Sequence, residues 1–74
     1  MKFLAYKDGT KVQIKLLKQT GIICGFTSKR NMVVTYDVSY NENGRYITVP
    51  MSPEEFEVHK DAVKVEVTGY KSFE

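Results

Sequence analysis

Residues 32–50 read MVVTYDVSYNENGRYITVP, and this stretch decides the fold class. Apolar side chains alternate with polar ones on both sides of Asn43-Gly44, and a period of two is typical of β-strands with one buried face. Asn-Gly readily adopts the positive φ angles of a tight hairpin turn. We therefore predict a β-hairpin with strands over 32–40 and 45–50, joined by residues 41–44.

The same alternation extends along the rest of the chain. It predicts further short strands over residues 3–6, 11–16, 20–27, 56–59 and 63–68. Residues 52–55 read SPEE, the pattern of a capped helical turn with Pro at its first position. Closing about five to seven short strands into an antiparallel barrel is how a small chain removes exposed sheet edges. We therefore predict an all-β barrel with one short helical turn.

The length of the chain limits what the fold can enclose. With 74 residues and a mass of 8.5 kDa it has room for one domain, residues 1–74, with a core barrel over about 10–58 and an extra strand over about 62–70. A chain this short buries only about 60 % of its unfolded surface, which leaves little volume for a deep catalytic cavity. We therefore expect a surface that binds a partner, with the extra strand covering a sheet edge or extending a partner's sheet.

Several segments of residues 10–58 follow one another in a recognisable order. They are KVQI at 11–14, TGIICGF at 20–26, YDVSY at 36–40, NGR at 43–45 and EEFEV at 54–58. In this order the chain resembles the SH3-like barrels of the Tudor and KOW type. The resemblance implies a non-enzymatic module that binds proteins, peptides or nucleic acids. Short stand-alone proteins of this type are common in bacteriophages, so the resemblance also implies a phage accessory or host-directed protein.

A second resemblance is to the Sm-like barrels, and it implies RNA or DNA binding. The order of that family's first motif is matched by Leu16, Gly21, Gly25 and Asn31-Met32. The two glycines lie closer together than in the family, Asn31 and Met32 stand in the reverse order, and the sequence predicts no leading helix. This alternative therefore ranks below the Tudor and KOW resemblance.

Catalysis and metal binding find little support in the sequence. His59 and Cys24 are the only residues of their kinds. Cys24 lies between apolar neighbours, which disfavour the thiolate that a Cys24/His59 nucleophilic pair would need, and a zinc site needs about four ligands. We therefore expect no enzymatic activity, no cofactor and no metal.

Cysteine content and hydropathy indicate the compartment. A single cysteine cannot form an internal disulfide and suits a reducing cytoplasm. The apolar run at residues 3–6 is too short for the core of a secretion signal, and residues 21–26 are far shorter than the roughly 18 apolar residues of a membrane span. We therefore expect a cytoplasmic protein that does not enter the membrane.

Tyrosines form most of the expected partner-binding surface. They are five of the nine aromatic residues, and tyrosine suits interfaces because it joins a flat apolar ring to a hydroxyl. We expect Tyr36 to belong to the core, and Tyr40 and Tyr46 to be exposed beside the polar turn. Together with Arg45 they make up the predicted binding site, and the expected partner is a protein, such as one supplied by a host.

Nucleic acid is the main alternative partner. Up to Tyr36 the chain carries seven basic residues and one acidic residue, whereas the remainder carries four basic and eight acidic residues. In this alternative five of the bases follow a phosphate backbone, namely Lys11, Lys15, Lys18, Lys29 and Arg30. The pI of about 8.7 lies below the value of about 9 that marks many nucleic-acid-binding domains. A third alternative is a self-assembling structural protein whose terminal strands pair between copies.

Overall fold

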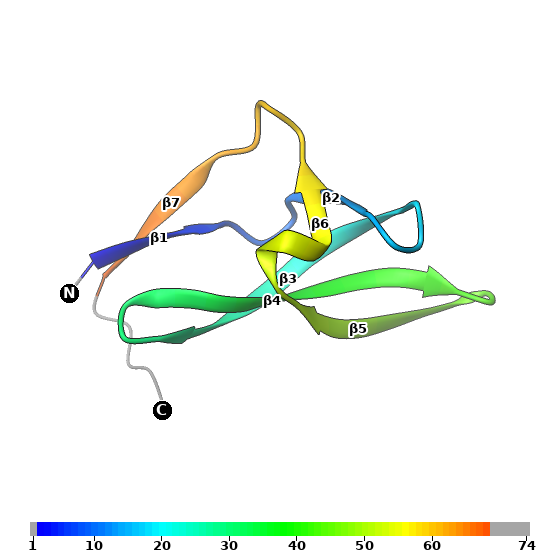
Figure 1. Cartoon of the computed structure of the whole chain (residues 1–74), viewed down its shortest axis with the longest axis horizontal. Coiled ribbons are helices and arrows are strands. Elements are labelled where there is room, and N and C mark those ends of the chain that lie inside the picture. The colour runs from blue at the N-terminus through cyan, green and yellow to red at the C-terminus, as the bar shows by residue number, and fades with distance from the viewer. Residues whose placement is uncertain (1, 69–74) are drawn as a thin grey trace.

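The computed structural model describes residues 2–68, and Figure 1 shows that they form an all-β structure. The strands are β1 (Lys2–Tyr6), β2 (Lys11–Ile14), β3 (Gln19–Lys29), β4 (Met32–Glu42), β5 (Arg45–Met51), β6 (Phe56–Val58) and β7 (Lys64–Thr68). The helical turn, η1, is of the 3-10 type and spans Pro53–Glu55. The predicted all-β class and the predicted turn are therefore confirmed. Within residues 2–68, none of the helical structure has the length and apolar character needed to cross a membrane.

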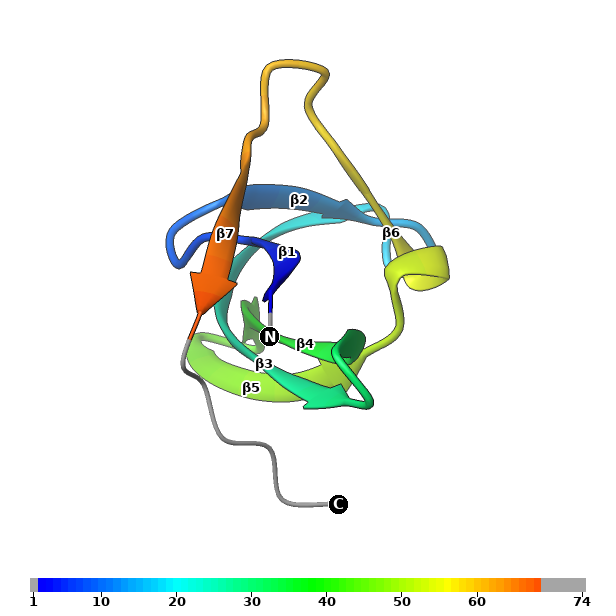
Figure 2. The same ribbon diagram turned by 90° about the vertical axis from the view of Figure 1, so that its left-hand side faces the viewer.

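The strands form two antiparallel sheets. Five of them are ordered β5-β4-β3-β2-β6, and β1 pairs with β7 as a separate two-stranded ribbon. Figure 2 shows the strands curled around a common interior. The five-stranded sheet is not closed into a barrel, because within residues 2–68 β5 pairs only with β4 and β6 pairs only with β2. The prediction of a closed barrel is wrong in this respect.

The chain between β5 and β6 explains why the sheet stays open. β5 ends at Met51, and η1 then carries the backbone from one edge of the sheet to the other. β6 has only three residues, and each of them is paired with β2. Pro50 near the end of β5 lacks an N–H group, so it cannot donate to a further strand.

The central hairpin follows the sequence closely. Glu42 pairs with Arg45 across a two-residue turn, in which Asn43 and Gly44 have φ angles of 52° and 88°. The Gly44 N–H donates to the Asn41 side-chain oxygen over 3.1 Å, which fixes the turn further. The predicted Asn-Gly hairpin is therefore confirmed.

Several strand boundaries differ from the prediction, most of them by one or two residues. β2 ends at Ile14, two residues early, so that residues 15–18 form a turn. β3 continues to Lys29, because Arg30 and Asn31 take φ angles of 55° and 63° and make a tighter turn than the polar sequence suggests. The predicted final strand is present as β7 from Lys64 to Thr68, and its expected continuation through residues 69–70 lies outside the described residues.

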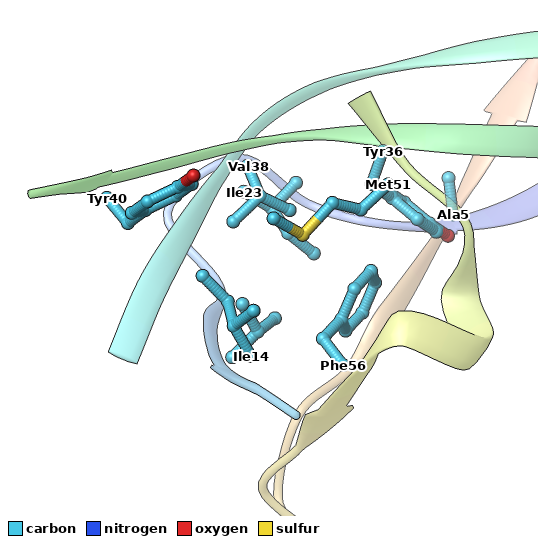
Figure 3. Close-up of a cluster of buried hydrophobic side chains, with 9 residues drawn as sticks. Ala5, Ile14, Ile23, Tyr36, Val38, Tyr40, Met51 and Phe56 are labelled. Carbon is cyan, nitrogen blue, oxygen red and sulfur yellow. The ribbon is translucent and has the colours of Figure 1, made fainter. Parts of the chain in front are cut away.

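The core lies inside the curled sheet and is built from inward-facing residues of β1 to β6. Its buried apolar members are Ala5, Val12, Ile14, Ile23, Tyr36, Val38, Tyr40, Met51 and Phe56. Figure 3 shows most of these side chains directed toward one another. A side chain on Gly21 would collide with this packing, since an added Cβ would lie 2.7 Å from Cγ1 of Val38. Glycine is therefore needed in β3 for close approach to β4, as the sequence indicates.

The β1–β7 ribbon packs against the sheet through aromatic side chains. The Tyr6 N–H donates to the Tyr36 hydroxyl over 3.1 Å, and Phe3 meets Phe26 edge to face with ring centroids 5.7 Å apart. Ala5, which lies between Phe3 and Tyr6 in β1, is fully buried. β7 thus pairs with β1 of the same chain, and it does not cover an edge of the five-stranded sheet.

Candidate functional site

The four residues of the predicted partner site do not form one surface. Tyr36 and Tyr40 are buried, with 2 % and 8 % of their surfaces exposed, whereas Tyr46 is 72 % exposed and Arg45 is also exposed. Tyr40 pairs with Ile47 and faces the core, while Tyr46 pairs with Asn41 and faces the opposite side of the sheet. The prediction that Tyr36 belongs to the core is confirmed. The prediction that Tyr40 is exposed is wrong, because Tyr40 continues the inward row of β4.

Tyr36 is a structural contact between the ribbon and the sheet. Its hydroxyl accepts the Tyr6 N–H, and its ring packs against those of Tyr6 and Phe56 with centroids 5.6 and 5.9 Å away. Burial raises the pKa of the Tyr36 hydroxyl above its ordinary value of 10.0. The hydroxyl therefore stays protonated to a higher pH than that of an exposed tyrosine, and the side chain connects the two sheets of the fold.

The five predicted nucleic-acid contacts are spread over the sheet. Lys15 and Lys18 lie in the turn between β2 and β3, while Lys29 and Arg30 lie at the turn between β3 and β4. Figure 1 shows these two turns at opposite ends of the sheet. The 11 residues of β3 between them span on the order of 30 Å at about 3.3 Å per residue. Lys11 stands alone on β2, beside Ile22 of β3. The structure therefore does not bring these bases together.

An apolar groove lies at the end of the sheet that carries the turn between β2 and β3. Leu16 and Leu17 of this turn are 89 % and 44 % exposed. They border a groove of about 320 Å³, which we call the Leu16–Leu17 groove. Its lining consists of Ile14, Lys15, Leu16, Leu17, Tyr40, Met51 and Glu55. Tyr40, one of the predicted partner residues, thus contributes to this groove from the core side.

The turn that carries the two leucines is fixed on both sides. The Lys15 N–H donates to the Glu55 carbonyl over 3.0 Å, and the Gln19 side-chain amide donates to the Asn41 carbonyl. Lys18 completes the turn with a φ angle of 53°. These contacts join the turn to η1 on one side and to β4 on the other, so the leucines are held in place.

The opposite wall of the groove is also ordered. The backbone N–H and the hydroxyl of Ser52 donate to Oε2 of Glu55 over 2.8 and 3.1 Å, which stabilises η1. Met51 is only 6 % exposed, and its unbranched side chain adapts readily to different neighbours. Lys15 and Glu55, which are both exposed, place one positive and one negative charge at the rim.

The sequence interpretation misses this groove because it assigns Leu16 to the buried face of a strand. The alternation of Val12 and Ile14 continues to Leu16 in the sequence, but β2 ends at Ile14 and Leu16 turns outward. One signal of the change is present, since Leu16-Leu17 places two large apolar residues side by side and breaks the period of two.

A second cleft, of about 340 Å³, separates the ribbon from the sheet. Its lining includes Tyr6, Tyr36, Phe56 and Lys64. The Lys64 ammonium lies 5.1 Å from the centroid of the Tyr6 ring, so the chain itself supplies a cation to this aromatic surface. The position that a ligand cation would take over Tyr6 is therefore occupied.

Cys24 and His59 engage different neighbours. The Cys24 thiol is exposed and lies 3.7 Å from the Ile22 carbonyl, contrary to the expected apolar surroundings. It points outward because Ile23 before it faces the core and successive side chains alternate along β3. Cys24 is also the residue left over at a register shift between β3 and β4. His59 Nδ1 accepts the Asp61 N–H over 3.1 Å and lies 3.4 Å from the Asp61 carboxylate. In the part of the chain that the structure describes, no three His, Cys, Asp or Glu side chains gather to hold a metal.

Comparison with known proteins gives no match to a family model, to a curated protein or to a solved structure.

Proposed function

We propose that this chain is a small, non-enzymatic protein-binding module whose Leu16–Leu17 groove receives an apolar side chain of a partner protein. The observation that carries the proposal is the 89 % exposure of Leu16 in a turn fixed by hydrogen bonds on both sides. Burying a leucine is worth about 1.5 to 3 kcal/mol. Leu16 stays exposed in the folded chain alone, so this free energy becomes available only when a partner covers it.

The shape and chemistry of the groove support a protein ligand. Its volume of about 320 Å³ is at the lower end of ligand sites, which run from about 300 to 1,000 Å³, and suits one or two side chains. Tyr40 and Met51 supply an apolar floor, and Lys15 and Glu55 supply charges of opposite sign at the rim. An extended segment with one bulky apolar residue between polar neighbours fits this arrangement.

The strand order supports the proposal that the fold is SH3-like and of the Tudor or KOW type. β2 to β5 form a meander, η1 follows, and β6 returns to pair with β2. The β1–β7 ribbon is an addition to this plan. The same resemblance carries our further proposals, namely a phage accessory or host-directed role in the cytoplasm and a host protein as partner. Binding by such a module uses surface recognition and no chemical step.

The proposal is tested by capture of the partner with three forms of the chain. Wild-type protein is compared with Leu16→Ser and with Tyr46→Ser, which removes another largely exposed side chain, on β5 outside the groove. After mass spectrometry identifies the partner, its affinity for each form is measured at low and moderate salt. We expect Leu16→Ser to weaken binding by at least about tenfold, equivalent to about 1.4 kcal/mol.

The control and the salt series separate the rival functions. Tyr46→Ser is expected to bind like wild type, and the affinity of an apolar contact is expected to change little with salt. Nucleic-acid binding predicts a steep salt dependence and loss of affinity in Lys29→Ala/Arg30→Ala. Unchanged binding by Leu16→Ser, combined with that salt dependence, would refute the protein-binding proposal.

A further inference from the structure

Within residues 2–68, the outer edge of β5 has no partner strand, and the pairing with β4 defines which backbone groups face this edge. β5 is an edge strand of the five-stranded sheet, and within residues 2–68 it pairs only with β4. Arg45 and Glu42 close a two-residue hairpin, which makes them a hydrogen-bonded pair. The backbone groups of every second residue after Arg45 also face β4. Those of Tyr46, Thr48 and Pro50 face outward.

Pro50 provides an independent check on this register. A proline within a sheet is tolerated where its nitrogen faces away from the neighbouring strand. Pro50 pairs with Asp37 and lies two residues from Thr48, so its nitrogen faces the free edge under the same alternation. The outward edge therefore offers two N–H donors, from Tyr46 and Thr48, and three carbonyl acceptors, from these residues and Pro50.

The donors at both ends of this edge are already used. The Gly44 N–H donates to the Asn41 side chain over 3.1 Å, and the Ser52 N–H donates to the Glu55 carboxylate over 2.8 Å. An added strand would therefore pair only with the stretch Tyr46–Pro50. The pairing stretch is therefore short, which limits the number of registers that an added strand can take.

We propose that two copies of this chain associate through β5, antiparallel to one another, about a twofold axis at Thr48. In this register the two Thr48 residues exchange two N–H···O=C bonds. Each Tyr46 N–H donates to the Pro50 carbonyl of the second copy, so that neither Pro50 needs a donor group. The edge is thus complementary to itself, as a twofold interface requires. This association is independent of the function proposed for the Leu16–Leu17 groove.

The side chains of β5 agree with this pairing. On the outer face the Tyr46 ring lies opposite Pro50 of the second copy. On the inner face Ile47 lies opposite Val49, and both are only partly buried in the single chain. Opposite apolar side chains on neighbouring strands contribute to sheet stability.

Charge complementarity selects a second copy as the occupant of this edge. In the same register Arg45 lies opposite Met51 of the second copy, directly before the acidic turn η1. Glu54 of that turn is exposed, as is Arg45. An arginine side chain is long enough to bridge neighbouring strand positions, so this pair is the ionic contact that the proposed register brings closest. Two Arg45–Glu54 ion pairs therefore border the interface symmetrically. A register shifted toward the hairpin turn, with Tyr46 opposite Thr48 of the second copy, would place Arg45 opposite Val49 and farther from this acidic turn.

The mass in solution tests the association directly. Sedimentation equilibrium of the full chain over a range of concentrations is expected to show a shift from 8.5 kDa toward twice that mass. Thr48→Pro removes the central outward N–H without removing a bond to β4, and is expected to stay monomeric. Thr48→Val keeps the N–H and is expected to associate like wild type. Circular dichroism establishes whether each variant folds.

Two further variants keep the proposal testable if Thr48→Pro does not fold. Arg45→Glu and Glu54→Arg are each expected to weaken association, and the double variant is expected to restore it. In a Cys24→Ser background, Thr48→Cys is expected to form a disulfide between copies, because Cα atoms of a hydrogen-bonded pair lie about 5.5 Å apart. Thr20→Cys, exposed in the middle of the sheet, is the control.

Several results would overturn the proposal. A monomer at all concentrations contradicts it, and so does an assembly larger than two. Association that survives Thr48→Pro, or that is lost in Leu16→Ser, would place the contact elsewhere on the chain.

Discussion

The contact between Tyr36 and the ribbon offers a sharp test of how the two sheets are held together. Tyr36→Phe keeps the ring and its packing against Tyr6 and Phe56, and removes only the oxygen that accepts the Tyr6 N–H. The donor is left in a partly buried position without an acceptor. An unsatisfied buried donor costs about 1 to 3 kcal/mol, and the partial exposure of Tyr6 places the expected loss near about 1 to 2 kcal/mol.

The size of this loss is large relative to the stability of the chain. At about 0.05 to 0.15 kcal/mol per residue, 74 residues correspond to a free energy of unfolding of roughly 4 to 11 kcal/mol. For a domain of this size each 1 kcal/mol lowers the Tm by about 4 to 8 °C. Thermal unfolding followed by circular dichroism therefore resolves the change.

Tyr46→Phe is the matched control, because the Tyr46 side chain is 72 % exposed and no hydrogen bond of its hydroxyl is observed within residues 2–68. We expect its Tm to stay within about 2 °C of wild type, as for most surface substitutions. Amide hydrogen exchange adds a local readout, since the Tyr6 N–H should lose protection in Tyr36→Phe. Equal Tm values for the two variants, with Tyr6 still protected, would refute the role assigned to the Tyr36 hydroxyl.

Three further predictions concern packing, pH and the exposed loop. Gly21→Ala is expected to destabilise the fold by about 1 to 3 kcal/mol, because its Cβ would lie 2.7 Å from Val38. Gly25→Ala is the control and is expected to cost less, because its Cβ would meet only the Asp37 carboxylate at 3.3 Å. Urea unfolding of both variants measures the two losses of stability. Because the folded-state pKa of Tyr36 is raised above 10.0, its contribution to stability is complete below pH 10.0 and is lost as the pH rises through that raised pKa. The free energy of unfolding of Tyr36→Phe is therefore expected to fall less steeply with pH in this range. An equal fall in both proteins would contradict the assignment. Leu16→Ser is expected to change the free energy of unfolding by less than about 0.5 kcal/mol, because the side chain is 89 % exposed; a larger loss in chemical denaturation would mean that Leu16 supports the fold.

Local signals in the sequence predict much of the fold. The two-residue turn at Asn43-Gly44 and the capped turn at Pro53–Glu55 depend on neighbouring residues, and both are present where expected. The inward row of β4 likewise follows from the period of two. It also places Tyr40 in the core, which the expectation of exposure beside the turn overlooked.

The remaining features depend on contacts between distant parts of the chain. β7 pairs with β1 across more than fifty positions of sequence, and nothing local to either strand indicates this choice. The open edge at β5 results from where η1 leads the chain. The outward position of Leu16 follows from a hydrogen bond between Lys15 and Glu55, which are forty residues apart. Alternation alone specifies which residues face inward, but not where a strand ends.

The groove is therefore the part of the molecule whose function most needs a direct measurement. Carbon-13 methyl and nitrogen-15 amide spectra of the chain, recorded as the captured partner is added, follow the methyl groups of Leu16, Leu17 and Met51 and the backbone amides individually. We predict that the largest shift changes and line broadening occur at these three residues, with the Lys29–Arg30 amides unaffected. Changes centred on Lys29–Arg30 or on the aromatic cleft beside Tyr6, with Leu16 and Leu17 unperturbed, would contradict the proposed site of binding.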